Sequence, residues 1–404
     1  MKKKIIYLSS FILIALGVGI FINQAFFKPT EINSFIATKI YSSPANKAFT
    51  DDNFYKCVID EYNKDHSTKL PYTTNLSDEQ LKTITRLNCD GYKKSDEEKI
   101  KNVDGLEKLT ALTDLNVNEN KLTNLDVSEN TALRELRVQI NGLTNLDVSK
   151  NTALTYLDVY YNQLTNLDVS KNTALKTLVA RDNQLINLDV SKNTALTYLN
   201  VDGNKLTNLD VSKNTALTYL NVYYNQLTNL DVSKNTALTY LDAYGNKLTN
   251  LDVSKNIVLK ELDVGHNQLT NTDVSKNTAL TQLYVGDNQL TSLDVSKNTA
   301  LTELLASSNQ LINIDLSGTT SLIKLDVSVN QLTNLDVSGA IALTSLNARN
   351  NQLTNLDVSK NTALTELRVD DNQLTNLDVS KNTALTELLA SSNQLINIDL
   401  SGTT

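Results

Sequence analysis

The sequence predicts an α/β solenoid, in which a parallel β-sheet lines the concave side and a small α-helical cap closes the N-terminal end. From Leu112 onward, one 21-residue unit occurs fourteen times without insertion or deletion, and the last copy stops one residue short at Thr404. In the unit Leu154–Ala174 the apolar residues fall at positions 1, 4, 6, 11, 14, 16 and 21, and the other copies follow this pattern with few exceptions. Upstream, Phe54, Cys57, Val58 and Tyr62 instead follow helical spacing. A fixed period of this length is typical of solenoids.

The unit Leu154–Ala174 illustrates the pattern. Apolar and polar residues alternate from position 4, so Leu157 and Val159 are expected to face inward from a short strand. A single coil cannot bury these side chains, whereas stacked coils bury them in one column. An asparagine occupies position 9 in all fourteen copies. We expect it to bond backbone groups where the chain leaves the strand.

Positions 1 to 11 spell L-x-x-L-x-V-x-x-N-x-L, which resembles the leucine-rich repeat pattern over about three quarters of the chain. This resemblance implies a leucine-rich repeat right-handed superhelix whose parallel strands form the concave face. On this interpretation, residues 112–404 are fourteen leucine-rich repeats, the last one incomplete.

Residues 1–30 have the composition of a targeting segment. Three lysines, Lys2 to Lys4, precede an apolar run from Ile5 to Ile22. This arrangement predicts a signal peptide or an uncleaved signal anchor, with cleavage favoured. Residues 31–50 are interpreted as a linker. The chain is therefore expected to be secreted or held at the cell surface, touching a membrane only through this segment if it is uncleaved.

Residues 51–111 are expected to form the N-terminal cap together with a lead-in repeat. Asp51 and Asp52 can cap a helix whose apolar residues include Cys57, and Ser77 with Gln80 forms a capping box for a second helix that starts near Asp78. The segment Ile84–Cys89 already follows positions 1, 4 and 6 of the repeat. The only cysteines are Cys57 and Cys89, and two buried thiols are favoured over a disulfide, which export would permit.

The order of these segments resembles the internalin family of Gram-positive surface proteins. The cap is followed by I-x-x-V-x-G-L-E-K-L-T-x-L-T-x-L (Ile100 to Leu115) and then by 21-residue units of the internalin J type. In that type, position 6 is often cysteine and forms a ladder, whereas this chain has Val159, Ala180 or Ala243 there. The resemblance implies surface display and binding to cells or matrix. No L-P-x-T-G sorting motif is present.

Composition argues against several other functions. The net charge of -8 disfavours nucleic acid as a partner. With only two histidines and no catalytic motif, the sequence predicts neither an enzyme nor a metal site, and no cofactor. Position 15 is aspartate in every copy and position 18 is lysine in ten. We interpret this stripe as a solvated face, in preference to a cation-binding ladder of carboxylates.

The variable positions 3, 5, 7 and 8 are expected to be exposed and available for a ligand. Nine of the ten tyrosines in the fourteen repeats fall in repeats three to seven. The predicted ligand-binding residues are Tyr156, Asp158, Tyr160, Tyr161, Arg181, Tyr198, Tyr219, Tyr223, Tyr224, Tyr240, Asp242 and Tyr244. Tyrosine offers a large apolar surface with few rotatable bonds and an orienting hydroxyl.

Two functions fit these observations. The first is an adhesin-like binding protein whose concave face recognises a protein, such as a receptor on a host or neighbouring cell, or a glycan. The second is a passive spacer or cell-wall element without a specific ligand, which the near-identity of positions 9 to 21 favours. The last coil would leave Leu385, Leu388, Leu395 and Ile398 uncovered, so we expect either a truncated fragment or a last coil that frays or pairs end to end.

Overall fold

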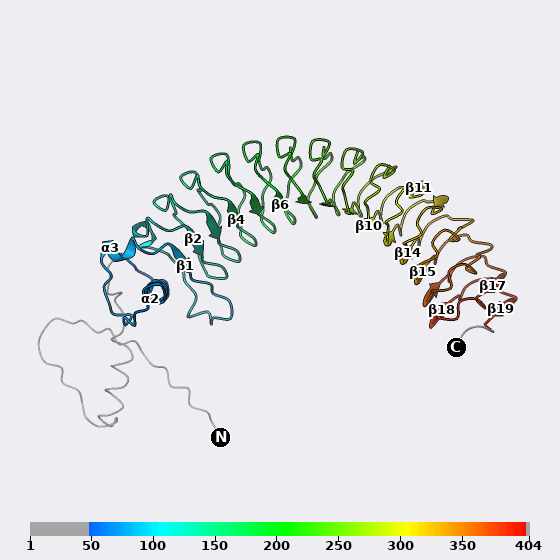
Figure 1. The fold of residues 1–404 in the computed structure, drawn as a ribbon, viewed down its shortest axis with the longest axis horizontal. Coiled ribbons are helices and arrows are strands. Elements are labelled where there is room, and N and C mark those ends of the chain that lie inside the picture. Colours follow the sequence, from blue (N-terminus) through cyan, green and yellow to red (C-terminus); the bar gives the residue numbers. More distant parts are fainter. Residues whose placement is uncertain (1–47, 401–404) are drawn as a thin grey trace, which may run out of the picture. The chain divides into compact units, whose positions relative to one another are not determined.

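The computed structural model describes residues 48–400, which belong to one compact unit. The predicted signal segment and most of the predicted linker lie outside these residues. Within the unit, successive coils follow a curved path with the main sheet on its inner side (Figure 1). Over residues 48–400, none of the helices is both long and apolar enough to cross a membrane.

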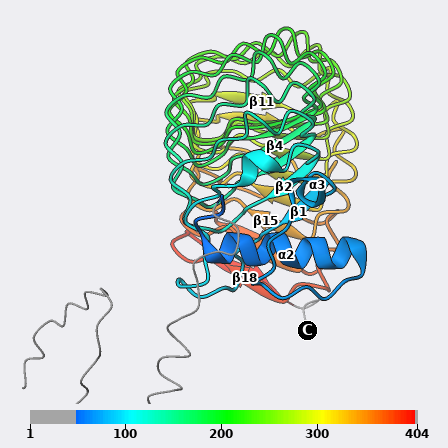
Figure 2. The ribbon, with the colours of Figure 1, turned by 90° about the vertical axis from the view of Figure 1, so that its left-hand side faces the viewer.

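The cap forms because its helix ends are satisfied as the sequence predicts. Helix α2 (Asp52–His66) is capped by Asp51, whose Oδ1 accepts hydrogen bonds from two backbone N–H groups at 2.9 and 3.0 Å. Helix α3 (Asp78–Leu81) begins with the expected capping box between Ser77 and Gln80. Seen from the N-terminal end, α2 lies across the stack of coils (Figure 2). The apolar side of α2 contacts β1 (Arg86–Asn88) and thus covers the first coil.

Cys57 and Cys89 form a disulfide, with an S–S distance of 2.06 Å. The expectation of two buried thiols was therefore wrong. Packing of α2 on β1 brings the two Cα atoms to 5.7 Å, within the range that a disulfide spans. The helical spacing of apolar residues explains why Cys57 is buried, and the repeat pattern explains why Cys89 is buried. Neither could give the distance between a helix and a strand 32 residues away.

The main sheet has fifteen parallel strands, β1 from the cap followed by one strand from each of the fourteen repeats. Each repeat strand covers positions 3 to 5, and neighbouring strands pair in a register offset of 21 residues, as in Leu220 with Leu241. The repeat strands are β2 (Asp114–Asn116), β3 (Glu135–Arg137), β4 (Tyr156–Asp158), β5 (Thr177–Val179), β6 (Tyr198–Asn200), β7 (Tyr219–Asn221), β8 (Tyr240–Asp242), β9 (Glu261–Asp263), β10 (Gln282–Tyr284), β12 (Glu303–Leu305), β14 (Lys324–Asp326), β15 (Ser345–Asn347), β16 (Glu366–Arg368) and β18 (Glu387–Leu389).

Among the described residues, four coils carry a second strand, and these strands form two separate two-stranded sheets. β11 (Ser292–Asp294) pairs with β13 (Asn313–Asp315), and β17 (Asn376–Asp378) pairs with β19 (Asn397–Asp399). In each pair the later strand has isoleucine at position 14, at Ile314 and Ile398, where most other coils have leucine. Isoleucine favours extended backbone because it is β-branched. A short 3-10 helix, Leu106–Lys108, precedes the first repeat.

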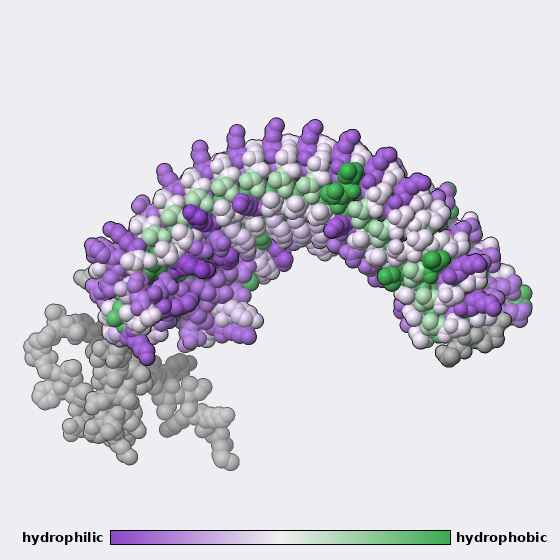
Figure 3. Space-filling view, viewed as in Figure 1, coloured by the Kyte–Doolittle hydropathy of each residue, from purple (hydrophilic) through white to green (hydrophobic). Residues whose placement is uncertain are grey.

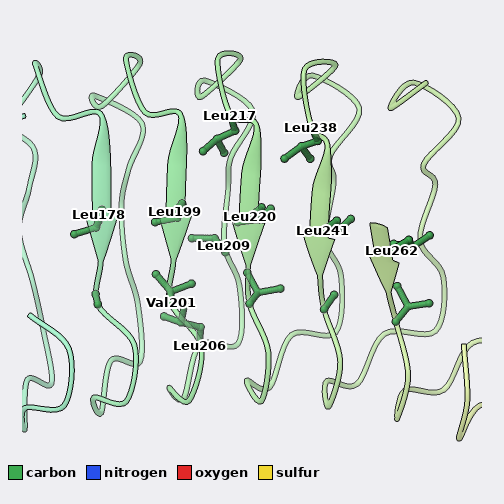
Figure 4. Close-up of a cluster of buried hydrophobic side chains, with 14 of the residues drawn as sticks. Leu178, Leu199, Val201, Leu206, Leu209, Leu217, Leu220, Leu238, Leu241 and Leu262 are labelled. Atoms are coloured by element: carbon green, nitrogen blue, oxygen red, sulfur yellow. The ribbon is translucent and has the colours of Figure 1, made fainter. Parts of the chain in front are cut away.

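The core is the predicted column of stacked side chains. Leu199, Leu220, Leu241 and Leu262 repeat at position 4 of adjacent strands, and each is fully buried (Figure 4). Burying a side chain of this size contributes roughly 1.5–3 kcal/mol. In the last coil, Ile398 is 39% exposed and Leu395 is only partly buried, whereas Leu385 is still buried at 4% exposure.

Asparagines bond the coils to each other, as expected for position 9. The Nδ2 of Asn162 donates to the carbonyl of Val138 in the preceding coil and to that of Val159 in its own, at 3.0 and 3.1 Å. Its Oδ1 accepts from the N–H of Leu143. A second asparagine, at position 19, also bonds adjacent coils: the Nδ2 of Asn172 donates to the carbonyls of Val148 and Asn151 in the preceding coil. These bonds satisfy buried backbone groups that have no strand partner.

The charged stripe is exposed, as expected, and its aspartates also have a structural role. The Oδ1 of Asp168 accepts from the N–H of Ser170 at 2.8 Å, and this bond lowers the pKa of the carboxyl group. Throughout residues 48–400, no ion pair joins the aspartates of position 15 to the lysines of position 18. Hydrophilic groups project once per coil along the outer edge (Figure 3).

Candidate functional site

Three tyrosines at position 3 form a continuous stack on the concave sheet. The ring centroids of Tyr198 and Tyr219 are 4.1 Å apart and those of Tyr219 and Tyr240 are 4.3 Å apart, with interplanar angles of 7° and 5°. The parallel register places the same position of adjacent coils at the spacing of neighbouring strands, roughly 4.8 Å, which suits ring stacking. Burial within this tyrosine stack raises the pKa of Tyr198 to about 12.

A second aromatic group lies where the chain leaves the strands, at positions 7 and 8. The ring of Tyr223 meets that of Tyr224 edge-on at 4.4 Å and stacks with that of Tyr244 at 5.2 Å. Glycines make room for these rings, because a Cβ at Gly245 would lie 2.8 Å from the ring of Tyr224, and one at Gly265 equally close to the ring of Tyr244. The variable residues of adjacent coils therefore pack closely, with each glycine leaving space for a tyrosine ring of the preceding coil.

The backbone holds position 8 in the left-handed region in all fourteen repeats. Tyr161 and Tyr224 adopt φ values of 52° and 44° there, and their side chains are 59% and 49% exposed. A left-handed conformation costs about 1 kcal/mol or more for a residue with a Cβ. Since glycine already occupies this position at Gly203 and Gly245, the fold does not require tyrosine there.

Position 5 is not uniformly exposed, which corrects the expectation made for Asp158 and Asp242. These two residues, with Asn200 and Asn221, are only 5–9% exposed. All four lie in the repeats that have tyrosine at position 3, whereas the other coils leave position 5 partly or fully exposed. The large rings at position 3 cover the neighbouring position on the same face. Asp158 and Asp242 therefore form the floor of the surface, below the tyrosines.

In repeat three, arginines from the two neighbouring repeats provide cations for the tyrosines. The guanidinium of Arg137 lies 4.6 Å from the ring centroid of Tyr156, and that of Arg181 lies 4.2 Å from the ring centroid of Tyr160. Arg181 also lies near the carboxylates of Asp182 and Asp202, at 3.5 and 3.7 Å. Burial raises the pKa of Asp158, and the hydrogen bond from the N–H of Tyr160 and the two arginines offset part of this effect.

In repeats seven and eight, acidic groups meet without a cation. Asp242 and Asp263 are register partners on β8 and β9, and Glu261 is the partner of Tyr240. We call Asp242, Glu261 and Asp263 the acidic cluster. Burial, reinforced by the other carboxylates, raises the pKa of Asp242 to about 7 and that of Asp263 to about 6. No lysine or arginine of the described residues forms an ion pair with the cluster.

The structure thus divides the predicted ligand-binding residues into two groups. Tyr156, Asp158, Tyr160, Tyr161 and Arg181 lie on repeats three and four. The other group, on repeats five to seven, comprises Tyr198, Tyr219, Tyr223, Tyr224, Tyr240, Asp242 and Tyr244. The sequence prediction omitted Glu261 and Asp263. Aspartate at position 5 of repeats seven and eight, directly after asparagine in repeats five and six, was the signal that could have identified them.

The fold and this variable inner face define the leucine-rich repeat class of solenoid proteins, and a family model described as Leucine Rich repeat matches residues 255–276. The functional domain of InlJ from Listeria monocytogenes, which includes a cysteine ladder, is 40% identical with a TM-score of 0.77. The match covers 85% of this chain and 74% of that domain. The chain therefore belongs to the internalin family. Its core has valine or alanine at position 6 throughout residues 112–400, so no cysteine ladder forms there.

Two further similarities agree with this assignment. The internalin InlF from L. monocytogenes 4b F2365 is 26% identical with a TM-score of 0.66, and the match covers 89% of this chain and 99% of that one. Internalin J of L. monocytogenes serotype 4b is 40% identical over 86 residues. That alignment spans 21% of this chain and only 8% of the whole internalin J protein.

Proposed function

We propose that this protein is exported and acts as an adhesin-like binding protein, secreted or held at the cell surface, that uses repeats three to seven of its concave face to bind another protein. The observation that carries the proposal is the confinement of nine tyrosines to these repeats, in two fitted groups on one face. Membership of the internalin family supports surface display. A receptor on a host or neighbouring cell is the kind of partner that this family suggests.

The size of the surface fits a protein partner. From β4 to β8 the strands span four coil steps, or roughly 19 Å at ordinary strand spacing. A face of that length and several side chains wide can form the central part of a standard interface, in which one partner's share is about 800 Å². Exposed Tyr161 and Tyr224 at its edge and half-buried Tyr219 and Tyr240 within it resemble the aromatic composition of binding hot spots.

The alternative is a passive spacer, which the near-identity of positions 9 to 21 supports. A spacer needs only the core and the asparagine bonds, which all coils share. It gives no reason for tyrosine at Tyr161 and Tyr224, where the left-handed backbone accepts glycine more easily. The tyrosines therefore favour binding.

The test compares two pairs of exposed tyrosines. The double variant Tyr161→Ser/Tyr224→Ser removes rings that are 59% and 49% exposed, and the control Tyr72→Ser/Tyr92→Ser removes cap rings that are 50% and 60% exposed. The purified chain and both variants are screened against arrays of extracellular proteins and of glycans. We expect protein ligands that bind the parent and the control but bind the concave variant at least about tenfold more weakly.

Equal binding by all three proteins would place the ligand site elsewhere, and the absence of any specific ligand would favour the spacer. Ligands found only on the glycan array would replace the protein partner with a carbohydrate, because tyrosine also stacks on sugars. Export is tested separately, by locating a C-terminally tagged chain in the medium or surface fraction of a Gram-positive host. Retention of the tagged chain in the cytoplasm would contradict it.

A further inference from the structure

The fold does not require the charges of Asp242 and Asp263. The Oδ1 of Asp242 accepts a hydrogen bond from the N–H of Tyr244, and the Oδ1 of Asp263 accepts one from the N–H of Gly265. Asn221, at the same position of the preceding coil, accepts the equivalent bond from the N–H of Tyr223 at 2.8 Å. An asparagine would thus complete the same turn without placing a charge at a buried position, as at Asp242, or a half-buried one, as at Asp263. The two carboxylates need another explanation.

We propose that the acidic cluster and Tyr240 form a subsite for an arginine side chain of a basic segment of the partner protein. The proposal rests on the binding function proposed above and names the chemistry of its ligand. The guanidinium would lie against the Tyr240 ring at the C-terminal end of the tyrosine stack, with its N–H groups toward Asp242, Asp263 and Glu261. Planar guanidinium both stacks on aromatic rings and bonds carboxylates, which suits a site made of these two groups.

The chain itself shows the same recognition four coils earlier. Arg181 places its guanidinium 4.2 Å from the Tyr160 ring while it approaches the carboxylate of Asp202 at 3.7 Å. Arg137 likewise lies on the ring of Tyr156, and its register partner is Asp158, the last residue of the Tyr-Leu-Asp strand β4. Tyr240 and Asp242 belong to an identical Tyr-Leu-Asp strand, for which the described chain supplies no arginine.

The charges that surround the subsite have one sign. Asp263, Asp202 and Glu261 all act on Asp242 and raise its pKa, and no cation opposes them. On the next strand, Glu261 takes the place that a fourth tyrosine would have in the stack, so the stack ends beside a carboxylate. His266, an exposed residue of the next coil, stacks its ring on that of Tyr244. An incoming guanidinium would relieve the repulsion among the carboxylates, and the arginine would gain from their prior arrangement.

The test uses a fluorescein-labelled peptide of alternating glycine and arginine, with a citrulline peptide of the same length as the uncharged control. Binding to the full chain is followed by fluorescence anisotropy at low salt and slightly alkaline pH. The variant Asp242→Asn/Asp263→Asn removes two charges and keeps both turn acceptors. The matched control Asp168→Asn/Asp189→Asn removes two charges from adjacent coils of the outer stripe, where each aspartate also accepts a backbone N–H.

We expect the arginine peptide to bind the parent and the outer-stripe control equally, within about twofold, and to bind the subsite variant at least about tenfold more weakly. The citrulline peptide should not bind. Equal losses in the two variants would show a general attraction of the acidic protein for cations and would overturn the proposal. Equal binding of the two peptides, or no binding of the arginine peptide to the parent, would also overturn it.

These outcomes are separable from the wider binding function. If the arginine peptide fails while array ligands still depend on Tyr161 and Tyr224, only the subsite is wrong. If no array ligand depends on those tyrosines but the arginine peptide distinguishes the subsite variant from its control, the acidic cluster binds arginine while the tyrosine-based function is wrong.

Discussion

Asp158 and Asp242 occupy the same position in strands of identical sequence, Tyr-Leu-Asp, yet they lie in opposite electrostatic surroundings. Both are buried under the ring at position 3 of their own strand, and both accept a hydrogen bond from the N–H two residues on. Asp158 lies between Arg137 and Arg181, which favour its charged form. The charged groups that act on Asp242 are the carboxylates of Asp263, Asp202 and Glu261. Burial raises the pKa of both carboxyl groups, and charged residues on neighbouring coils oppose this effect at Asp158 and reinforce it at Asp242.

The comparison separates the hydrogen bond that each coil needs to form its turn from the charge that determines which ligand the surface can bind. Asn200 and Asn221 show that position 5 can be uncharged without loss of the turn, since the Oδ1 of each accepts the same backbone N–H. In repeat three, arginines from repeats two and four complete the tyrosine and carboxylate site. In repeats seven and eight, the same kind of site lacks its cation, and that makes it the better candidate for a ligand.

The largest effect tests the feature that the two regions share. Leu157→Asp and Leu241→Asp each place a carboxylate in the fully buried column. We expect both to destabilise the protein by about 4 kcal/mol or more and to unfold several adjacent coils, because an unpaired charge in a dry core has no compensation. Hydrogen exchange measured by mass spectrometry would map the unfolded coils. Markedly different results at the two sites would mean that the cores of the two regions are not equivalent.

The second largest effect should distinguish the surroundings of Asp242 from those of Asp158. The pKa of Asp242 is raised from 3.8 to about 7, so the folded state binds its proton more tightly than the unfolded state. Its stabilising contribution is present below about pH 4 and is lost as the pH rises through 7. We therefore expect Asp242→Asn to raise the free energy of unfolding at pH 8 by roughly 1–3 kcal/mol, and to change it little at pH 4. Urea denaturation at both pH values would measure this.

The matched variant is Asp158→Asn, which removes the same charge beside two arginines. We expect a clearly smaller gain at pH 8, because the arginines already compensate the carboxylate. An equal gain from both variants would contradict the comparison and would show that burial alone determines the charge state at position 5.

A third change, with a smaller effect on stability, should make the surroundings of Asp158 resemble those of Asp242. Arg137→Gln/Arg181→Gln removes both cations from the rings of Tyr156 and Tyr160. We expect the pKa of Asp158 to rise further, as seen by NMR titration of its carboxyl carbon, and the free energy of unfolding to fall by about 1 kcal/mol as two cation–π contacts are lost. The pKa of Asp242 should not move, since neither arginine acts on it. A shift at Asp242 would show long-range coupling between the regions.

The smallest effect belongs to the outer stripe, where the regions should not differ. In Asp168→Asn and Asp252→Asn, the amide oxygen can still accept the N–H of the serine two residues on. We expect thermal unfolding of both variants to match the parent within about 0.5 kcal/mol at neutral pH. A larger loss at either position would mean that the charge itself, beyond the turn bond, stabilises the stripe.

The sequence by itself determined the fold because each coil repeats the same physical problem. Leucine or valine every 21 residues, as in Leu157 and Val159, can be buried only against the next coil, so the period specifies a parallel stack. The capping aspartate Asp51 and the capping box of Ser77 could also be predicted, because their bonding partners lie only two or three residues away in the sequence. Asn162 could be assigned to backbone bonding because buried turns always need donors and acceptors.

Only the tertiary structure decided matters that depend on distance between coils or elements. It joined Cys57 to Cys89 by placing α2 against β1. It buried Asp158 and Asp242 beneath tyrosine rings, where simple alternation along a strand predicted exposure. It also gave Asp158 two arginines and Asp242 none, although both strands read Tyr-Leu-Asp. Desolvation and the attraction between charges depend on separation in space, and the stack brings together residues that the sequence holds a full coil apart.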